Sequence, residues 1–432
     1  MSRTLRAQGA LSLLTVIFVM ALSSTAWAVE STLSLSHVIA LSMQHNAELR
    51  ALREELGVRD AGVTRAGLLP NPTLDLEAGT GALTGSKNEN SLALGLSQEI
   101  PLVGKRGKRI SVAEQERDLY RWQLLDKERR LREEVKTAFY DALLAKERVA
   151  LADSSIALNR QLLDVTKERL SAGDIPELEM NLVKVELARS EGARIESAKT
   201  MLQNQARLWT LMGLASGSRP EITGTLDIGT LVAGTLADLQ QRANANRPDL
   251  RALKAEKKRG EADITLAQAE KIPNLTAGLV LRRDTTSMEI AGQEGKDTAY
   301  TVGIRLSIPI PLFDRNRAGV QEATARKNST ESRLNGTFMA VEREVATAYA
   351  TFEHAVSVLS LYRIDIIPQL EENLKLTQEA YRLGETGIIA VIQEQKKFFE
   401  VSEGHLTALR DRQVALVRLE SATATELTGG EK

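Results

Sequence analysis

The most constraining feature of this sequence is a run of apolar and small residues that occurs twice. In each run the residues alternate four and three positions apart, and every position of the second run lies 210 residues after its counterpart in the first. A sustained period of 3.5 is typical of the seam along which helices pair in a coiled coil. The positions are Leu131, Val135, Ala138, Ala142, Ala145, Val149, Ala152 and Ile156, then Val341, Val345, Ala348, Phe352, Ala355, Leu359, Tyr362 and Ile366.

The sequence around the first seam allows a very long helix. No proline occurs from Leu102 to Ile175, and the stretch is rich in helix-favouring Ala, Leu, Glu, Lys and Arg. A helix from about Gly107 to Gly173 would be roughly 100 Å long, at about 1.5 Å per residue. A compact globular domain has no room for it, so the seams favour a tube of paired helices or a coiled-coil scaffold. In the second half, Pro368 predicts a kink.

Other segments also recur in the same order, which predicts a duplicated helix-hairpin-helix unit. The offsets between counterparts are 201, 203, 210 and 211 residues, so insertions are small. A glycine-rich segment, residues 213–236, separates the copies. We expect repeat 1 at 29–225 and repeat 2 at 226–432, with turns between the long helices near 173 and 384. The recurring segments are 49–52 with 250–253, Pro70-Asn71 with Pro273-Asn274, 100–102 with 310–312, and Gly173 with Gly384.

Between the helices the period changes from 3.5 to 2, which predicts strands at about 73–83, 90–101, 274–283 and 299–309. Charged residues occupy the alternate positions between the leucines and so lie on the opposite face of each strand. This is the pattern of strands with lipid on one side and a water-filled lumen on the other. A soluble sheet packed on a core would show the same alternation. The expected lumen-facing charges are Asp75, Glu77, Glu99, Arg282 and Arg305.

Four strands are too few to close a membrane barrel. An open sheet edge in hydrocarbon leaves backbone groups unpaired, at several kcal/mol each. If the strands lie in a membrane, the chain therefore needs at least one further copy of itself.

The N-terminus predicts export. Arg3 and Arg6 precede an apolar run, and Ala26-Trp27-Ala28 is a small-x-small cleavage site, so residues 1–28 form a predicted signal peptide. The chain has no cysteine, which excludes a lipid-anchored N-terminus, and its net charge of −1 offers no basic excess for nucleic acid.

These features together resemble the TolC family of outer-membrane efflux proteins over essentially the whole mature chain. Pro-Asn enters the first strand of each copy, and Ile-Pro-Leu leaves the second. The resemblance implies a mostly α fold with a small transmembrane β portion, in which a homotrimer forms a 12-stranded β-barrel continuous with a long periplasmic α-helical tunnel. It also implies the outer membrane of a Gram-negative bacterium, a periplasmic adaptor and an inner-membrane RND-type pump.

Within this family, the run from Ser97 to Arg109 is similar to the strand-to-helix junction of heavy-metal efflux channels of the CzcC and CusC kind. The resemblance implies a passive conduit for solutes, with heavy-metal cations preferred as cargo. Its four basic residues, Lys105, Arg106, Lys108 and Arg109, are expected to form a solvated junction. Alternatives are a type I protein-secretion or drug-efflux channel of the same fold, and a soluble periplasmic coiled-coil adaptor or scaffold.

The resemblance also implies roles for the turns between the long helices. The expected adaptor-docking turns contain Leu170, Ser171 and Gly173, and Leu383 and Gly384. Some family members narrow the pore with aspartates just past the second turn, where this chain has Ala390 and Gln393. Nearby carboxylates could replace that ring, or could be ordinary solvated helix-end charges. The candidate gate residues are Glu385, Gln393, Glu394, Asp174 and Glu177.

No arrangement of residues predicts catalysis, a cofactor or a resident metal. The histidines at 37, 45, 354 and 405 lack metal-ligand spacing, and Met180, Met201 and Met212 are 21 and 11 residues apart. We interpret both sets as structural.

Overall fold

A computed structural model describes residues 32–86, 88–214, 220–227, 234–290 and 292–427. The predicted signal peptide lies outside these residues. The chain forms two compact units, each described by itself below. The first unit takes Met1–Ser42 and Ala138–Ile228, and the second takes Met43–Thr137 and Gly229–Lys432. The units therefore do not follow the predicted repeat boundary, because the longest helix crosses from one unit into the other.

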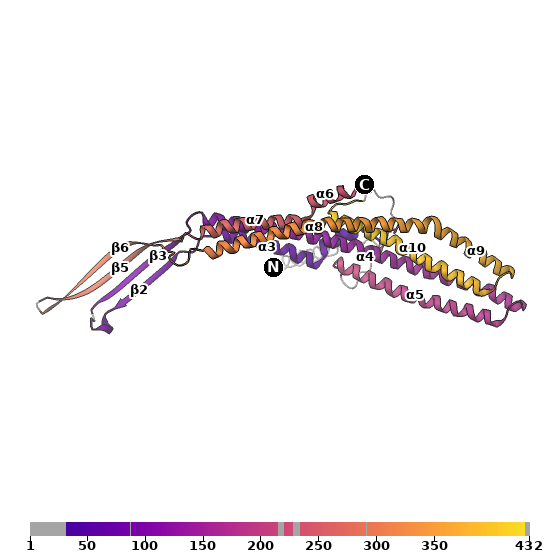
Figure 1. Cartoon of the computed structure of the whole chain (residues 1–432). Coiled ribbons are helices and arrows are strands. Elements are labelled where there is room, and N and C mark those ends of the chain that lie inside the picture. The colour runs from indigo at the N-terminus through magenta and orange to yellow at the C-terminus, as the bar shows by residue number, and fades with distance from the viewer. Residues whose placement is uncertain (1–31, 87, 215–219, 228–233, 291, 428–432) are drawn as a thin grey trace, which may run out of the picture. The chain divides into compact units, whose positions relative to one another are not determined.

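Helices and strands follow the same order in both halves of the chain (Figure 1). The first half contains α2 (Leu35–His45), α3 (Ala47–Ala66), β2 (Thr73–Thr80), the 3-10 turn η1 (Ala82–Thr84), β3 (Asn90–Ile100), α4 (Lys105–Ala172) and α5 (Glu177–Leu211). The second half contains α6 (Leu236–Asn246), α7 (Pro248–Ala269), β5 (Leu275–Ile290), β6 (Gln293–Ser307), α8 (Arg317–Leu361), the π-helical turn η2 (Tyr362–Ile366), α9 (Ile367–Leu383) and α10 (Ile388–Thr423). Two short strands, β1 (Thr32–Leu33) and β4 (Glu221–Ile222), pair in parallel.

Local sequence explains where several helices begin. The Asn46 side chain accepts a hydrogen bond from the Leu49 N–H at 3.0 Å and caps α3. Thr235 and Asp238 form a reciprocal capping box at the start of α6. At α7, by contrast, Arg247 occupies the cap position without a capping side chain, and Pro248 provides the first helical residue.

The four long strands form one antiparallel sheet in the order β2-β3-β5-β6. β2 is shorter than predicted because the Thr80 hydroxyl accepts the Ala82 N–H and the chain turns into η1. The second hairpin is longer than predicted, since β5 and β6 stay paired as far as Ile290 and Gln293. Its connection includes Gly292, whose φ of +79° suits glycine. The offset between counterpart positions rises from 203 before this hairpin to 210 after it, so the second copy has seven extra residues here. These residues lengthen the hairpin.

The second long helix contains the break predicted at Pro368. Because Pro368 has no N–H to donate, the backbone widens just before it into the π-helical turn η2. A π turn takes up one extra residue, which matches the change of offset from 210 to 211 between the seam and the following turn. The predicted seam ends here: Ile366 is 36% exposed, and the buried residues beyond are Leu370, Leu374 and Tyr381.

Each unit has its own core. In the second unit, residues of α6, α7, α8 and α10 pack together, among them Leu239, Leu250, Val345 and Leu419. In this unit the sheet and the α9–α10 turn lie at opposite ends of the helices (Figure 1). In the first unit, α4 and α5 run side by side, and their fully buried side chains include Val183 and Leu208.

Candidate functional site

The four-stranded sheet has two chemically different faces. Strand pairing places Leu96 opposite Leu279 and Leu279 opposite Ile304, whereas Arg282 lies opposite Ala93 and Thr301. All five predicted strand charges, Asp75, Glu77, Glu99, Arg282 and Arg305, fall on the face that also carries Gly95, Val280 and Gly303. Two polar residues, Arg283 and Gln98, lie instead on the face of the leucines.

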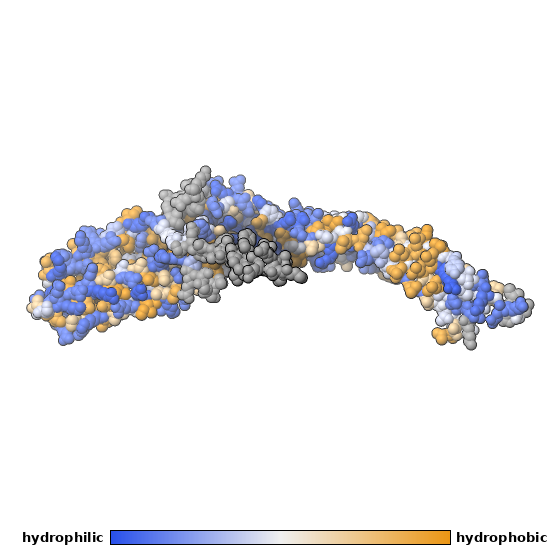
Figure 2. Space-filling view, turned by 180° about the vertical axis from the view of Figure 1, so that it is seen from behind, coloured by the Kyte–Doolittle hydropathy of each residue, from blue (hydrophilic) through white to orange (hydrophobic). Residues whose placement is uncertain are grey.

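The apolar face is exposed. Leu96 is 53% and Leu279 is 59% accessible, and Ile304 on the neighbouring strand is more exposed still. Apolar residues gather over the strands in the space-filling view (Figure 2). A contiguous apolar surface of this kind requires a covering partner or lipid. The outer strands β2 and β6 each have a pairing partner on one side only among the described residues.

No helix in the described ranges is both long and apolar enough to cross a membrane.

The strand-to-helix junction joins motifs from the two halves of the chain. Lys105 is 8% exposed, and its Nζ donates to Asn274 Oδ1 at 2.6 Å. The Asn274 amide in turn donates to Glu99 Oε1 at 2.5 Å. Gln98 on the next strand position donates to the Pro70 carbonyl at 2.8 Å. The expectation of a solvated cluster is therefore wrong for Lys105, which is buried and has a half-buried partner, Asn274, in the recurring Pro-Asn segment.

The first turn between long helices belongs to the first unit. Gly173 has a φ of +82°, its N–H donates to the Leu170 carbonyl, and the next N–H donates to Arg169. This is the hydrogen bonding of a helix that ends on a left-handed glycine. Ser171, Asp174 and Glu177 are exposed, whereas Leu170 is half-buried.

The second turn belongs to the second unit and repeats this geometry at Gly384, whose φ is also +82°. Leu383, Glu385 and Gln393 are exposed. Glu394 differs: its side chain is 20% exposed and 4.0 Å from Lys397 Nζ. Its Oε1 atom is buried and has no hydrogen-bond partner in the described part of the chain. Glu394 lies about 9 Å along the α10 axis from Ile388 at the start of this helix.

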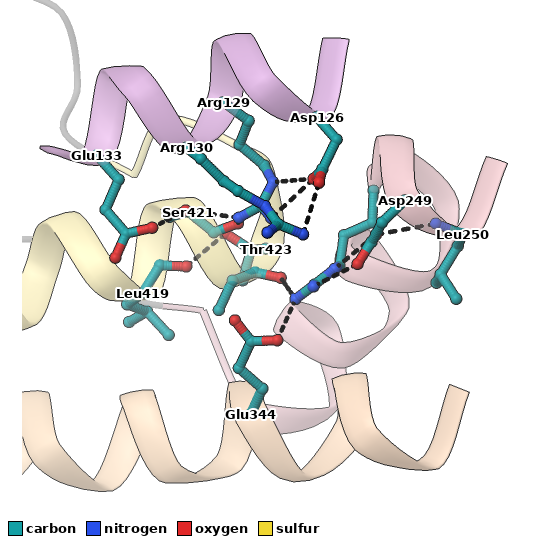
Figure 3. Close-up of polar contacts among 12 residues, drawn as sticks. Asp126, Arg129, Arg130, Glu133, Asp249, Leu250, Glu344, Leu419, Ser421 and Thr423 are labelled. Carbon is teal, nitrogen blue, oxygen red and sulfur yellow. Dashed lines mark hydrogen bonds and ion pairs between the residues drawn. The ribbon is translucent and has the colours of Figure 1, made fainter. Parts of the chain in front are cut away.

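A polar network in the second unit was not predicted (Figure 3). Arg247, with 5% of its side chain exposed, donates to Asp249 at 2.6 Å, to Glu344 at 2.7 Å and to the Ala422 carbonyl at 3.1 Å. Burial alone would raise the pKa of Asp249, but the hydrogen bonds and charge of Arg247 outweigh it and hold that pKa below its usual value.

A second arginine ties the same helix end to α4. Arg129 donates to Asp126 at 2.8 Å and to the Ser421 carbonyl at 2.9 Å, and the Ser421 hydroxyl donates to Glu133 at 2.6 Å. The contacts to Ser421 join positions nearly 300 residues apart, so no local pattern could have revealed them. The sequence offered one signal of this network: the second half has Arg247 at the position where the first half has the helix-capping Asn46.

In the described residues, no three His, Cys, Asp or Glu side chains are grouped closely enough to hold a metal ion. The candidate gate residues also make no such group.

The sequence matches the family model described as outer membrane efflux protein over residues 38–214 and 239–425. The cobalt-zinc-cadmium resistance protein CzcC of Cupriavidus metallidurans is 25% identical over 377 residues, which are 87% of this chain and 86% of that protein. The toluene efflux pump outer membrane protein TtgF of Pseudomonas putida is 24% identical over 409 residues, or 88% of this chain and 81% of that protein.

Among solved structures, CusC superposes with a TM-score of 0.74 at 18% identity, covering 90% of this chain and 91% of that one. The fold is therefore that of an outer-membrane efflux channel.

Proposed function

From the membership of this chain in the family of outer membrane efflux proteins, we propose that it is the outer-membrane channel of a tripartite efflux system. The observation that carries the proposal is a sheet with an exposed apolar face and two free edges, continued directly by very long helices. The channel is a passive conduit: an inner-membrane RND-type pump supplies the energy, and a periplasmic adaptor couples pump to channel. A soluble periplasmic scaffold does not fit the family.

The functional assembly is a homotrimer. One chain contributes four strands, and three chains contribute twelve, an even number within the range of outer-membrane barrels. The free edge of β6 then pairs with β2 of the next copy, which satisfies the backbone groups that an open edge would leave unpaired in lipid. The apolar face contacts lipid, the charged face lines the lumen, and the helices continue the lumen into the periplasm.

The chain organisation follows the sequence repeat. Residues 1–28 are a signal peptide, and the duplicated halves are 29–225 and 226–432. Helices and strands follow the same order in both halves, and the family model matches two separate segments, one in each half. Both observations support this division.

Heavy-metal cations are the proposed cargo. CzcC, similar over most of both chains, is named for resistance to cobalt, zinc and cadmium. The charged sheet face also favours cations modestly: Asp75, Glu77 and Glu99 stand against two arginines, of which Arg282 is paired with Asp284 at 3.3 Å. An organic solute is the second candidate, because TtgF is named for toluene efflux. Protein secretion is the third.

The two turns are the proposed adaptor contacts, through Leu170, Ser171 and Gly173, and through Leu383 and Gly384. The exposure of the leucine at the second turn supports a docking role. The proposed periplasmic gate consists of Glu385, Gln393 and Glu394, with Asp174 and Glu177 from the first turn. The low exposure of the Glu394 side chain, whose Oε1 atom has an ion pair with Lys397 at 4.0 Å but no hydrogen bond among the described residues, supports a role beyond a solvated helix end.

Deletion of the gene in cells that express the pump tests the cargo. Loss of tolerance to cobalt, zinc or cadmium, restored by the wild-type gene, is the expected result. Unchanged metal tolerance combined with lost toluene tolerance would assign the channel to organic solutes. Unchanged tolerance to both, with protein export impaired, would assign it to secretion.

Bilayer conductance tests the gate. The double variant Glu385→Gln, Glu394→Gln should reduce cation over anion selectivity, measured as a smaller reversal potential in a salt gradient. The matched control is Glu371→Gln, Glu372→Gln, which removes the same charge from α9 away from the turn. Equal effects in both variants would remove the gate from these residues.

A further inference from the structure

The apolar face of the second hairpin changes character toward its distal end. Strand pairing aligns Leu94, Leu281 and Val302 across three strands, and the next level outward aligns Leu92, Arg283 and Tyr300. Beyond them, Thr285 pairs with Thr298, and then Ser287 pairs with Lys296. On this face the leucine band therefore ends in an arginine, a tyrosine, two threonines and a lysine.

Arg283 and Lys296 differ from the adjacent Arg282, which lies on the opposite face and pairs with Asp284. Both are exposed, and neither forms a hydrogen bond or an ion pair with any residue that the structure describes. The aspartates of this region, Asp284 and Asp297, lie on the other face.

On β6, the face of Arg283 and Lys296 carries an acidic residue, Glu294, only near the hairpin tip. There Glu294 pairs with Glu289 in the strand register and accepts a hydrogen bond from Asn88 at 3.4 Å. Between the leucine band and the tip, the described strands therefore place no acidic residue on the face of Arg283 and Lys296.

We propose that Arg283 and Lys296 bind the phosphate groups of lipid headgroups in the outer leaflet. This inference rests on the proposed function, because it requires the apolar face to contact lipid. An exposed arginine at the edge of a lipid-facing band places its guanidinium among the headgroups, and that group binds a phosphate through two parallel hydrogen bonds. Tyr300 beside it corresponds to the aromatic girdle of membrane barrels.

The spacing along β6 fits the polar layer. Lys296 lies four residues beyond Tyr300, or about 13 Å along the strand. With a tilt of about 35–45°, this is about 10 Å along the membrane normal. The polar layer is roughly 5–8 Å deep on each side of the hydrocarbon. Arg283 therefore lies at the inner edge of this layer, and the flexible stem of Lys296 reaches into it from outside.

Native mass spectrometry of the purified assembly tests this proposal. The probes are phosphatidylglycerol and a phosphate-free galactolipid with the same acyl chains. The test variant is Arg283→Gln, Lys296→Gln, and the control is Arg282→Gln on the opposite face. We expect the test variant to bind phosphatidylglycerol about tenfold more weakly, equivalent to about 1.4 kcal/mol, with galactolipid binding unchanged. The control should stay within about twofold.

An equal loss in the control, or no loss in the test variant, would overturn the proposal. If the double variant does not assemble, Arg283→Gln and Lys296→Gln are measured separately; each should weaken phosphatidylglycerol binding, and no loss in either single variant would also refute the phosphate contact. If the wild type binds neither lipid, the apolar face does not contact lipid and the proposed function fails. Galactolipid binding without a preference for phosphatidylglycerol rejects the phosphate contact alone.

Discussion

Each half of the chain contains long helices that we call an arm: α4 and α5 form the first arm, and α8, η2, α9 and α10 form the second. The two arms share one sequence period but differ in packing. In the first, α4 is continuous over 68 residues. Three positions after the seam residue Ile156 it carries the buried Asn159, whose amide donates to Ser190 on α5 at 2.7 Å. In the second, the same seam is displaced at η2, and Leu370, 211 residues after Asn159, takes its place as a buried apolar residue.

The difference has a steric counterpart on the facing helices. Where the second arm has Tyr362 against Gly404, the positions 210 and 211 residues earlier are Ala152 and Ala193. A Cβ on Gly404 would lie 2.6 Å from the Tyr362 hydroxyl. One arm thus combines a large and a small residue at its π turn, whereas the other has one alanine on the continuous helix α4 and one on α5. A duplicated pattern therefore sets the pairing of helices, while single residues decide whether an arm is straight or kinked.

The prediction with the largest expected effect concerns the apolar sheet face, on which the two halves of the chain agree. Leu96→Arg in the first half and Leu279→Arg in the second lie directly opposite each other. Each should impair outer-membrane assembly equally, because an arginine facing lipid costs roughly 2–4 kcal/mol per site. The measurement is the amount of assembled protein in the outer-membrane fraction.

Val280→Arg is the control, since it adds the same charge one residue away on the other face. Gly278→Arg is unsuitable because a Cβ there would lie 2.9 Å from the Leu96 carbonyl oxygen. Equal impairment by Val280→Arg would contradict the assignment of faces.

The next effect compares Asn46 with Arg247, which occupy the same position in the two halves. Arg247→Ala leaves Asp249 and Glu344 without their partner and should destabilise the fold by about 3–5 kcal/mol. Asn46→Ala removes only a helix cap, worth about 1 kcal/mol. Thermal unfolding of the purified protein in detergent should rank them in this order. Similar losses would mean that the buried network adds little beyond a cap.

Acid should weaken the Arg247 network selectively. Since the folded pKa of Asp249 is depressed, its stabilising contribution is present above the ordinary aspartate pKa of about 4 and is lost as pH falls through the lower folded value. Asp249→Asn should therefore flatten the dependence of the unfolding temperature on pH below about 4. A slope identical to that of the wild type would show that other groups control acid stability.

Gly404→Ala tests the π turn. Overpacking against Tyr362 should destabilise the second arm by about 1–3 kcal/mol. Gly336→Ala is a sharp control, because no atom lies within 4 Å of a Cβ there and the change should stabilise helix α8 by roughly 0.5–1 kcal/mol. Stabilisation by both substitutions would indicate that Tyr362 moves aside freely.

The smallest effect concerns the polar seam of the first arm. The double substitution Asn159→Leu, Ser190→Val installs the residues found 211 positions later, Leu370 and Val401. Replacing both partners of a buried hydrogen bond by apolar groups is nearly neutral, so the unfolding free energy should change by less than about 1 kcal/mol. Asn159→Ala alone should cost more than the double substitution, because it removes one partner and leaves a cavity. The reverse order would reject a packing origin for the difference between the arms.

Much of this architecture was predictable because it rests on local periodicity. The period of 3.5 predicted the long paired helices, and the period of 2 predicted four strands in which Asp75, Glu77, Glu99, Arg282 and Arg305 share one face. The family resemblance and the outer-membrane location are confirmed by the match over both halves. Even the longer hairpin and the π turn were encoded, as changes in the offset between copies.

What only the tertiary structure decided are the contacts between distant residues. Lys105 became buried because Asn274, 169 residues away, accepts its hydrogen bond. Arg247 became the centre of a network because folding brought Glu344 and the end of α10 to it. The physical reason is that a periodic pattern specifies which face of an element is apolar. Which polar groups lose water together, and so must pair, depends on how separate elements pack.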